Sequence, residues 1–135
     1  MNIFLPALLL MFHTLLVAAY MGYRRFTAIT RGEVSLDYYK LYHGEEHEPL
    51  RKIARHFSNL LEVPPLFYLL TIIAFVSQLT GTLVVALAWA YVLLRLVHSY
   101  VHLGSNNVPV RFRIFVLSMV VLLAYLLVIV AGLLL

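Results

Sequence analysis

The fold is decided by a stretch in which strongly polar side chains enter a long apolar run, Arg55-His56-Phe57-Ser58-Asn59-Leu60-Leu61-Glu62-Val63-Pro64-Pro65-Leu66-Phe67. On a helix that turns by about 100° per residue, Arg55, Asn59 and Glu62 share one stripe roughly 10 Å long, which Leu66 continues. A charge inside lipid is costly unless it faces the bundle interior, finds a partner or lines a wet cavity. We therefore interpret the stripe as a functional or assembly site. The alternative is a helix still emerging from the headgroups, in which Arg55 snorkels and only Glu62 needs an explanation.

The composition indicates an integral membrane protein. Of the 135 residues, 63% are hydrophobic and only 12% are charged, whereas about 25% are charged in a typical soluble domain. The length suffices for about four helices of ~20 residues and one substantial loop. We predict an all-α, membrane-embedded four-helix bundle that forms one domain over residues 1–135, with spans near residues 3–23, 50–76, 83–103 and 109–134.

Cysteine content and charge distribution narrow the function further. The chain has no cysteine, so any thiol chemistry must use a thiol of the substrate. The net charge is +4, and all basic residues lie within residues 24–55 or are Arg95, Arg111 or Arg113. Because these residues sit beside membrane spans rather than on a soluble basic face, we expect no nucleic-acid partner.

The first apolar run ends at Gly22-Tyr23-Arg24-Arg25 and is long enough to span a bilayer. A cleaved signal peptide is the alternative, because Val17-Ala18-Ala19 offers small residues near a cleavage site. Signal peptides begin with a positively charged segment, and no Lys or Arg precedes Arg24. We therefore expect a retained span.

The loops predict the orientation in the membrane. Residues 24–54 carry most of the charge, and the aromatic segment at residues 37–42 suits a position at the headgroups. The link at residues 77–82 has no charge. By the positive-inside rule, residues 24–54 and 104–113 face the cytoplasm and both termini lie outside.

Two further features concern the second and third spans. Pro64-Pro65 should kink the second span directly after Glu62 and open space beside the polar stripe. In the third span, Tyr91, Arg95, His98 and His102 follow the spacing i, i+4, i+7, i+11, so they form one stripe that we expect to face inward.

Two histidine patterns raise the question of a metal. His98 and His102 have the spacing of a metal-binding pair, and Glu62 could supply a third ligand. No second carboxylate completes such a site, and Arg95 would oppose a cation. The segment His43-Gly44-Glu45-Glu46-His47 matches an HxxEH pattern, but Gly44 and Pro49 disfavour the long helix it requires. We therefore expect no metal site.

The chain resembles the MAPEG family, the membrane-associated proteins in eicosanoid and glutathione metabolism, in its bacterial-type members. The pattern RxxxNxxExxPLF is met by Arg55, Asn59, Glu62 and Pro65-Leu66-Phe67. Downstream, the RxxH, LG and PxR elements of the glutathione-using branches are met in order by Arg95 to His98, by Leu103-Gly104, and by Pro109 to Arg111.

The resemblance implies a left-handed four-helix bundle, usually a homotrimer, that holds glutathione or a lipid between neighbouring subunits at the cytoplasmic end. It implies the plasma membrane of a bacterium as the location, membrane lipids and a small lipophilic substrate as partners, and glutathione as the cofactor. By position, Arg111 would stabilise the glutathione thiolate as the catalytic residue. The expected glutathione-binding residues are Arg55, Asn59, Glu62, Arg95 and His98. Glu62 would either bind the glutathione ammonium or orient Arg95.

The chain departs from the family pattern in two respects. Phe115 stands where the prostaglandin synthase branch has a tyrosine, and Phe57 and Ser58 replace polar or basic residues beside Asn59.

The leading hypothesis is a glutathione-dependent membrane transferase or peroxidase for lipophilic electrophiles. The alternative is a non-enzymatic lipid-binding or scaffold member. A proton-coupled transporter built on Glu62, His98 and His102 would need a polar path through the outer half of the membrane, which spans two and three lack.

Helical periodicity separates the two arginines of the fourth span. Phe115, Ser118 and Tyr125 lie at i+4, i+7 and i+14 from Arg111, so they share its face. Arg113 lies about 160° away. A stripe of hydroxyl groups belongs inside the bundle or at a subunit interface, so we expect Arg111 inside and Arg113 at the lipid phosphates.

Overall fold

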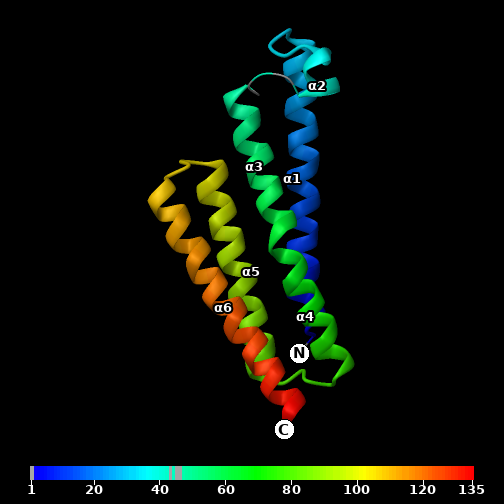
Figure 1. The fold of residues 1–135 in the computed structure, drawn as a ribbon, viewed down its shortest axis with the longest axis vertical. Helices are drawn as coiled ribbons and strands as arrows, with labels where there is room; N and C mark the ends of the chain where they lie inside the picture. Colours follow the sequence, from blue (N-terminus) through cyan, green and yellow to red (C-terminus); the bar gives the residue numbers. More distant parts are fainter. Residues whose placement is uncertain (1, 43, 45–46) are drawn as a thin grey trace.

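The computed structural model describes residues 2–42, 44 and 47–135, and its elements there are six α-helices (Figure 1). They are α1 (Phe4–Thr30), α2 (Leu36–Leu41), α3 (Glu48–Glu62), α4 (Pro64–Val76), α5 (Thr82–Leu103) and α6 (Val108–Leu134). Within this described part of the chain, four segments are long and apolar enough to cross a membrane: α1, α3 with α4, α5 and α6. The prediction of an all-α membrane protein is therefore confirmed.

The first helix is longer than its apolar part. It continues past the expected end at residue 23, through Arg24 and Arg25, to Thr30. No glycine or proline that would break the helix follows Gly22 until Gly32. Gly32 has φ 70°, which glycine adopts without strain, and its N–H donates to the carbonyl oxygen of Ile29 at 3.0 Å. The charged segment that begins at Arg24 is therefore partly helical rather than wholly a loop.

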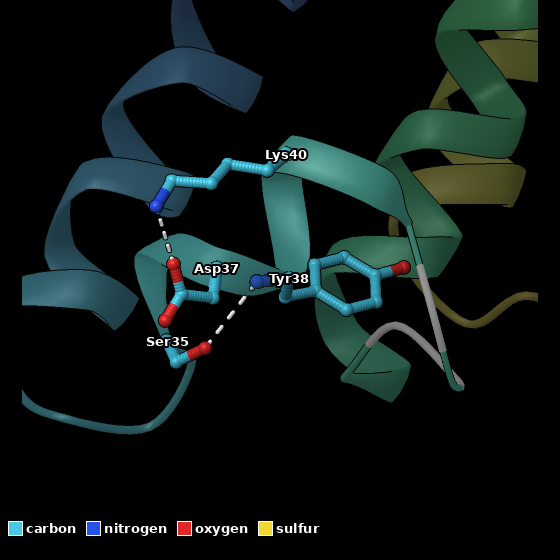
Figure 2. Close-up of polar contacts among 4 residues, drawn as sticks. All are labelled: Ser35, Asp37, Tyr38 and Lys40. Carbon is cyan, nitrogen blue, oxygen red and sulfur yellow. Dashed lines mark hydrogen bonds and ion pairs between the residues drawn. The ribbon is translucent and has the colours of Figure 1, made fainter.

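A second helix lies within this charged segment (Figure 2). The Ser35 hydroxyl caps α2 by accepting a hydrogen bond from the backbone N–H of Tyr38 at 3.3 Å. The Lys40 ammonium pairs with the Asp37 carboxylate at 2.6 Å. The Arg25 guanidinium lies 5.3 Å from the ring centroid of Tyr39, which connects α2 to the end of α1.

The second span is interrupted at the predicted position. Helix α3 ends at Glu62 and α4 begins at Pro64, with Val63 between them. Neither Pro64 nor Pro65 has a backbone N–H, so the carbonyl groups one turn earlier lose their helical donors there. The predicted kink is thus present as a break between two helices, directly beyond the polar stripe.

Helix α5 is the most buried of the four spans and packs against α1, α3 and α6. Because lipid is as apolar as the helix surfaces, close packing rather than removal from water holds these helices together. Ala88 is fully buried and lets its neighbours approach. The Phe67 ring of α4 lies 4.8 Å from the Tyr91 ring and 5.7 Å from the Tyr125 ring. Outward side chains of α6 such as Val120 and Leu123 are exposed, as a lipid-facing surface requires.

The spans run alternately up and down, which separates the two ends of the bundle (Figure 1). Both termini and the link between α4 and α5 lie at one end, and α2 and the turn between α5 and α6 point to the other. In that turn Gly104 ends α5, and the Asn107 side chain caps α6 by accepting from the N–H of Val110 at 3.2 Å. We call the end with α2 and residues 104–107 the loop end.

Candidate functional site

The polar stripe of α5 is buried inside the bundle. Tyr91 and Arg95 have no exposed surface, and His98 and His102 are each 2% exposed. The prediction that this stripe faces inward is confirmed.

Arg95 joins three helices. Its Nη2 donates to the backbone carbonyl of Asn59 in α3 at 2.7 Å, and its guanidinium lies 5.7 Å from the ring centroid of Phe115 in α6. Its Nε and Nη1 are buried without a hydrogen-bond partner. Among the described residues Glu62 forms no ion pair with Arg95, and its side chain is exposed. Glu62 therefore remains available to a ligand or a neighbouring chain.

Among the described residues, three cavities lined by polar side chains lie at the loop end, and Arg111 lines each of them. The first, of about 440 Å³, lies between the start of α3 and the turn at residues 104–106, and Arg55 and His102 also line it. The second, of about 390 Å³, is lined by Arg55, Asn59, Glu62 and His102 as well. The third, of about 180 Å³, is also lined by Asn59, together with His98 and Phe115. The structure thus gathers the expected binding residues around Arg111, except for Arg95, which lies buried beneath them.

The two arginines of α6 differ as their positions on the helix predict. Arg111 is half-buried, and its Nη1 donates to the Asn106 side-chain oxygen at 2.8 Å. Asn106 has φ 50°, a left-handed conformation that asparagine tolerates. Arg113 is exposed, whereas Ser118 and Tyr125 on the face of Arg111 are buried.

His56 is a buried polar residue that the sequence analysis did not select. It has no exposed surface, and its Nδ1 lies 3.2 Å from Nδ1 of His102. Its Nε2 is hydrogen-bonded to the Ser99 hydroxyl, which also bonds Nε2 of His13 at 2.6 Å. His56 lies about 100° away from Arg55 on the helix, so it is not part of the polar stripe that the sequence indicated. Its position at i+3 from Ile53 and i−4 from Leu60, both buried, was the available indication.

The potential metal ligands that the structure brings together differ from the set that the sequence suggested. One ring nitrogen from each of His56, His98 and His102 lies within 4.8 Å of the other two. Glu62, the third ligand considered above, is exposed and does not belong to this cluster. The HxxEH pattern includes His43, Glu45 and Glu46, which lie outside the described residues.

Comparison with known proteins identifies the family. A sequence model of the MAPEG family matches residues 3–131, which is nearly the whole chain. No curated protein and no solved structure gave a match. With four membrane-spanning helices and a family match over almost its full length, the chain belongs to the MAPEG family and is a multi-pass membrane protein related to glutathione and eicosanoid metabolism.

Proposed function

We propose that this protein is a glutathione-dependent membrane transferase or peroxidase that acts on lipophilic electrophiles reaching the site from the bilayer. The observation that carries the proposal is the position of Arg111, which lines all three polar cavities at the loop end. In the family's enzymes, an arginine at the corresponding position stabilises the glutathione thiolate. We assign the same role to Arg111.

The charges around the cavities suit glutathione, which has two carboxylates, one ammonium and one thiol. The largest of these three cavities is lined by one carboxylate, Glu48, and by four cationic side chains, Arg51, Lys52, Arg55 and Arg111. Arginine forms paired hydrogen bonds with carboxylates, so these residues complement the two acidic groups of the ligand. Glu62 lines the adjoining cavity, and its carboxylate would accept a hydrogen bond from the glutathione ammonium.

A guanidinium beside the sulfur favours the thiolate over the thiol, as positive groups do for cysteine. The thiolate is the nucleophile that attacks an electrophilic carbon or a peroxide oxygen. Since the chain itself contains no cysteine, glutathione would supply the sulfur for either reaction.

We also propose that the protein is a homotrimer whose sites are completed between neighbouring chains. Arg55 and Glu62 belong to a membrane-spanning segment, yet both are exposed in the single chain. A neighbouring chain or a polar ligand would remove these charges from lipid. Native mass spectrometry in mild detergent should give a trimer, and a spectrum of monomers alone would refute the assembly.

For the cellular location, we propose the plasma membrane of a bacterium, with the loop end in the cytoplasm and both termini outside. The proposal rests on the basic residues at the loop end and on the resemblance to bacterial-type family members.

The function is tested by calorimetric titration of glutathione into the purified protein in detergent. We expect saturable binding, and we expect the sulfonate analogue of glutathione to compete because it keeps the two carboxylates and the ammonium. A wild-type protein that releases no heat of binding with either compound would overturn the proposal.

A second candidate function is non-enzymatic lipid binding. It is favoured by Phe115, which lacks the hydroxyl found at this position in the prostaglandin synthase branch, and by an apolar cavity of about 310 Å³. That cavity is lined by α4 and α6 side chains including Leu66, Leu70 and Met119. Binding of a fatty acid without binding of glutathione would support this function instead.

A further inference from the structure

Three histidines meet in the bundle interior where α3 and α5 pack together. His56 comes from α3, and His98 and His102 lie one helical turn apart on α5. Their side chains are buried, and one ring nitrogen of each lies within 4.8 Å of the others. No other group of three or more potential ligands this close was found among the described residues. His98 is also among the expected glutathione-binding residues, whereas the proposed glutathione chemistry assigns no task to His56 or His102.

The spacing of the rings suits a shared metal ion. Nδ1 of His56 and Nδ1 of His102 lie 3.2 Å apart. Two nitrogens bound to one tetrahedral zinc ion at about 2.0–2.1 Å are roughly 3.3–3.4 Å apart, so the observed spacing needs little adjustment. Nδ1 of His98 is buried and has no hydrogen-bond partner. An unpartnered nitrogen in the protein interior is unfavourable, and coordination would satisfy it.

A second layer of hydrogen bonds orients the His56 ring. Its Nε2 is bonded to the Ser99 hydroxyl, and Ser99 is also bonded to Nε2 of His13 in α1. When His56 carries its proton on Nε2 and donates it to Ser99, the lone pair of Nδ1 faces His102. Metal-binding histidines are commonly held in this way, with one nitrogen on the metal and the other donating to a neighbouring group.

The cluster also has access from the loop end. His102 lines the two larger polar cavities, and His98 lines the smallest. These cavities offer an entry path and room for a fourth ligand. Arg111 lines the same cavities. The Phe115 ring lies beside both the Arg95 guanidinium and the His98 ring. Because three imidazoles are neutral and both arginines are cationic, the fourth ligand should be an anion such as hydroxide.

We propose that His56, His98 and His102 bind one divalent transition-metal ion of the Zn²⁺ type through their neutral imidazole rings, with the fourth position open to the polar cavities. Imidazole is a preferred ligand for zinc, cobalt, nickel and copper. The sequence pattern suggested only two of these ligands, since the third comes from another helix.

The test uses the full chain, produced without a polyhistidine tag, stripped of metal and kept free of glutathione. Titration with Co²⁺ should produce the intense visible absorption of a four-coordinate complex and saturate at one ion per chain, and Zn²⁺ should displace it. Zn²⁺ should also raise the thermal midpoint of the wild-type protein. Glutathione is absent, so a failure here leaves the proposed transferase or peroxidase function standing.

The variants separate this cluster from other histidines. His56→Gln and His102→Gln should each lose the Co²⁺ absorption and the Zn²⁺-dependent rise in thermal midpoint. Ser99→Ala should weaken binding about 10- to 100-fold, because it removes only the orienting hydrogen bonds. The matched control is the double variant His43→Gln, His47→Gln, which alters the HxxEH segment and should bind like the wild type.

Two results would overturn the proposal. One is a wild-type protein that gives no cobalt absorption, which needs no variant to interpret. The other is absorption that survives in His102→Gln or disappears in the His43→Gln, His47→Gln control, because the metal would then be bound elsewhere.

Discussion

At the scale of single residues, the two arginines of α6 offer a direct test of the proposed chemistry. Arg111 lines the polar cavities and bonds Asn106, whereas Arg113 is exposed. We expect Arg111→Ala to abolish the ultraviolet absorbance of the glutathione thiolate and to weaken binding about tenfold or more, the effect of losing a hydrogen bond from a charged group. Arg113→Ala, the matched control, should still form the glutathione thiolate and should mainly lower the stability of the protein in the membrane. Equal thiolate in wild type and Arg111→Ala would remove this role from Arg111.

Phe115 refines the same prediction. Its ring lies beneath the Arg95 guanidinium and beside His98, and a tyrosine ring would keep both contacts. Phe115→Tyr should leave glutathione affinity unchanged and raise turnover, because it adds a hydroxyl donor to the cavity that Arg111 also lines, where we propose that the sulfur binds. Unchanged turnover with intact binding would show that this position does not reach the sulfur.

At the scale of secondary-structure elements, the turn between α5 and α6 forms part of the site, because Gly104, Ser105 and Asn106 line a cavity at the loop end. A Cβ added at Gly104 would lie 2.8 Å from the backbone carbonyl oxygen of Tyr100, which cannot move without distorting α5. Directly before this turn, the carbonyl oxygen of Leu103 accepts a hydrogen bond from the Lys52 ammonium at 2.8 Å. We expect Gly104→Ala to lower the stability by roughly 1–3 kcal/mol, measured as a lower thermal midpoint in detergent.

Gly22→Ala is the matched control for that substitution. Gly22 lies within α1, and a Cβ there meets nothing within 4 Å. Alanine should therefore stabilise the helix by about 0.5–1 kcal/mol. A thermal midpoint that falls as far in Gly22→Ala as in Gly104→Ala would contradict the steric explanation.

At the scale of the whole molecule, the alternating spans make the orientation testable. Because the natural chain has no cysteine, single cysteines report sidedness without background. Ser35→Cys and Ser105→Cys lie at the loop end, and Thr80→Cys lies in the link at the opposite end; all three native residues are exposed. In intact cells, only Thr80→Cys should react with an impermeant thiol reagent, since basic loops stay in the cytoplasm. The reverse pattern would place the loop end outside.

The hydropathy and the helical periodicity of the sequence were sufficient to predict that this is a membrane protein and which side chains face inward. Apolar runs long enough for a bilayer fixed the membrane class, and the spacing from Tyr91 to His102 placed those side chains on one inward face. The position of Arg111 on the face of Ser118 and Tyr125 followed in the same way. These properties are local, because a helix converts sequence spacing directly into direction.

Only the tertiary structure decided what meets across the helices. His56 and His102 lie 46 residues apart and touch at 3.2 Å, and Arg95 donates to the carbonyl group of Asn59 rather than pairing with Glu62. Helical spacing gives the face of each helix but neither its height nor its rotation relative to a neighbour, which depend on packing between the helices. The predicted end of the first span was wrong for a related reason. Hydropathy reports where lipid contact ends, but the backbone hydrogen bonds of a helix continue until a residue such as Gly32 lets the chain turn.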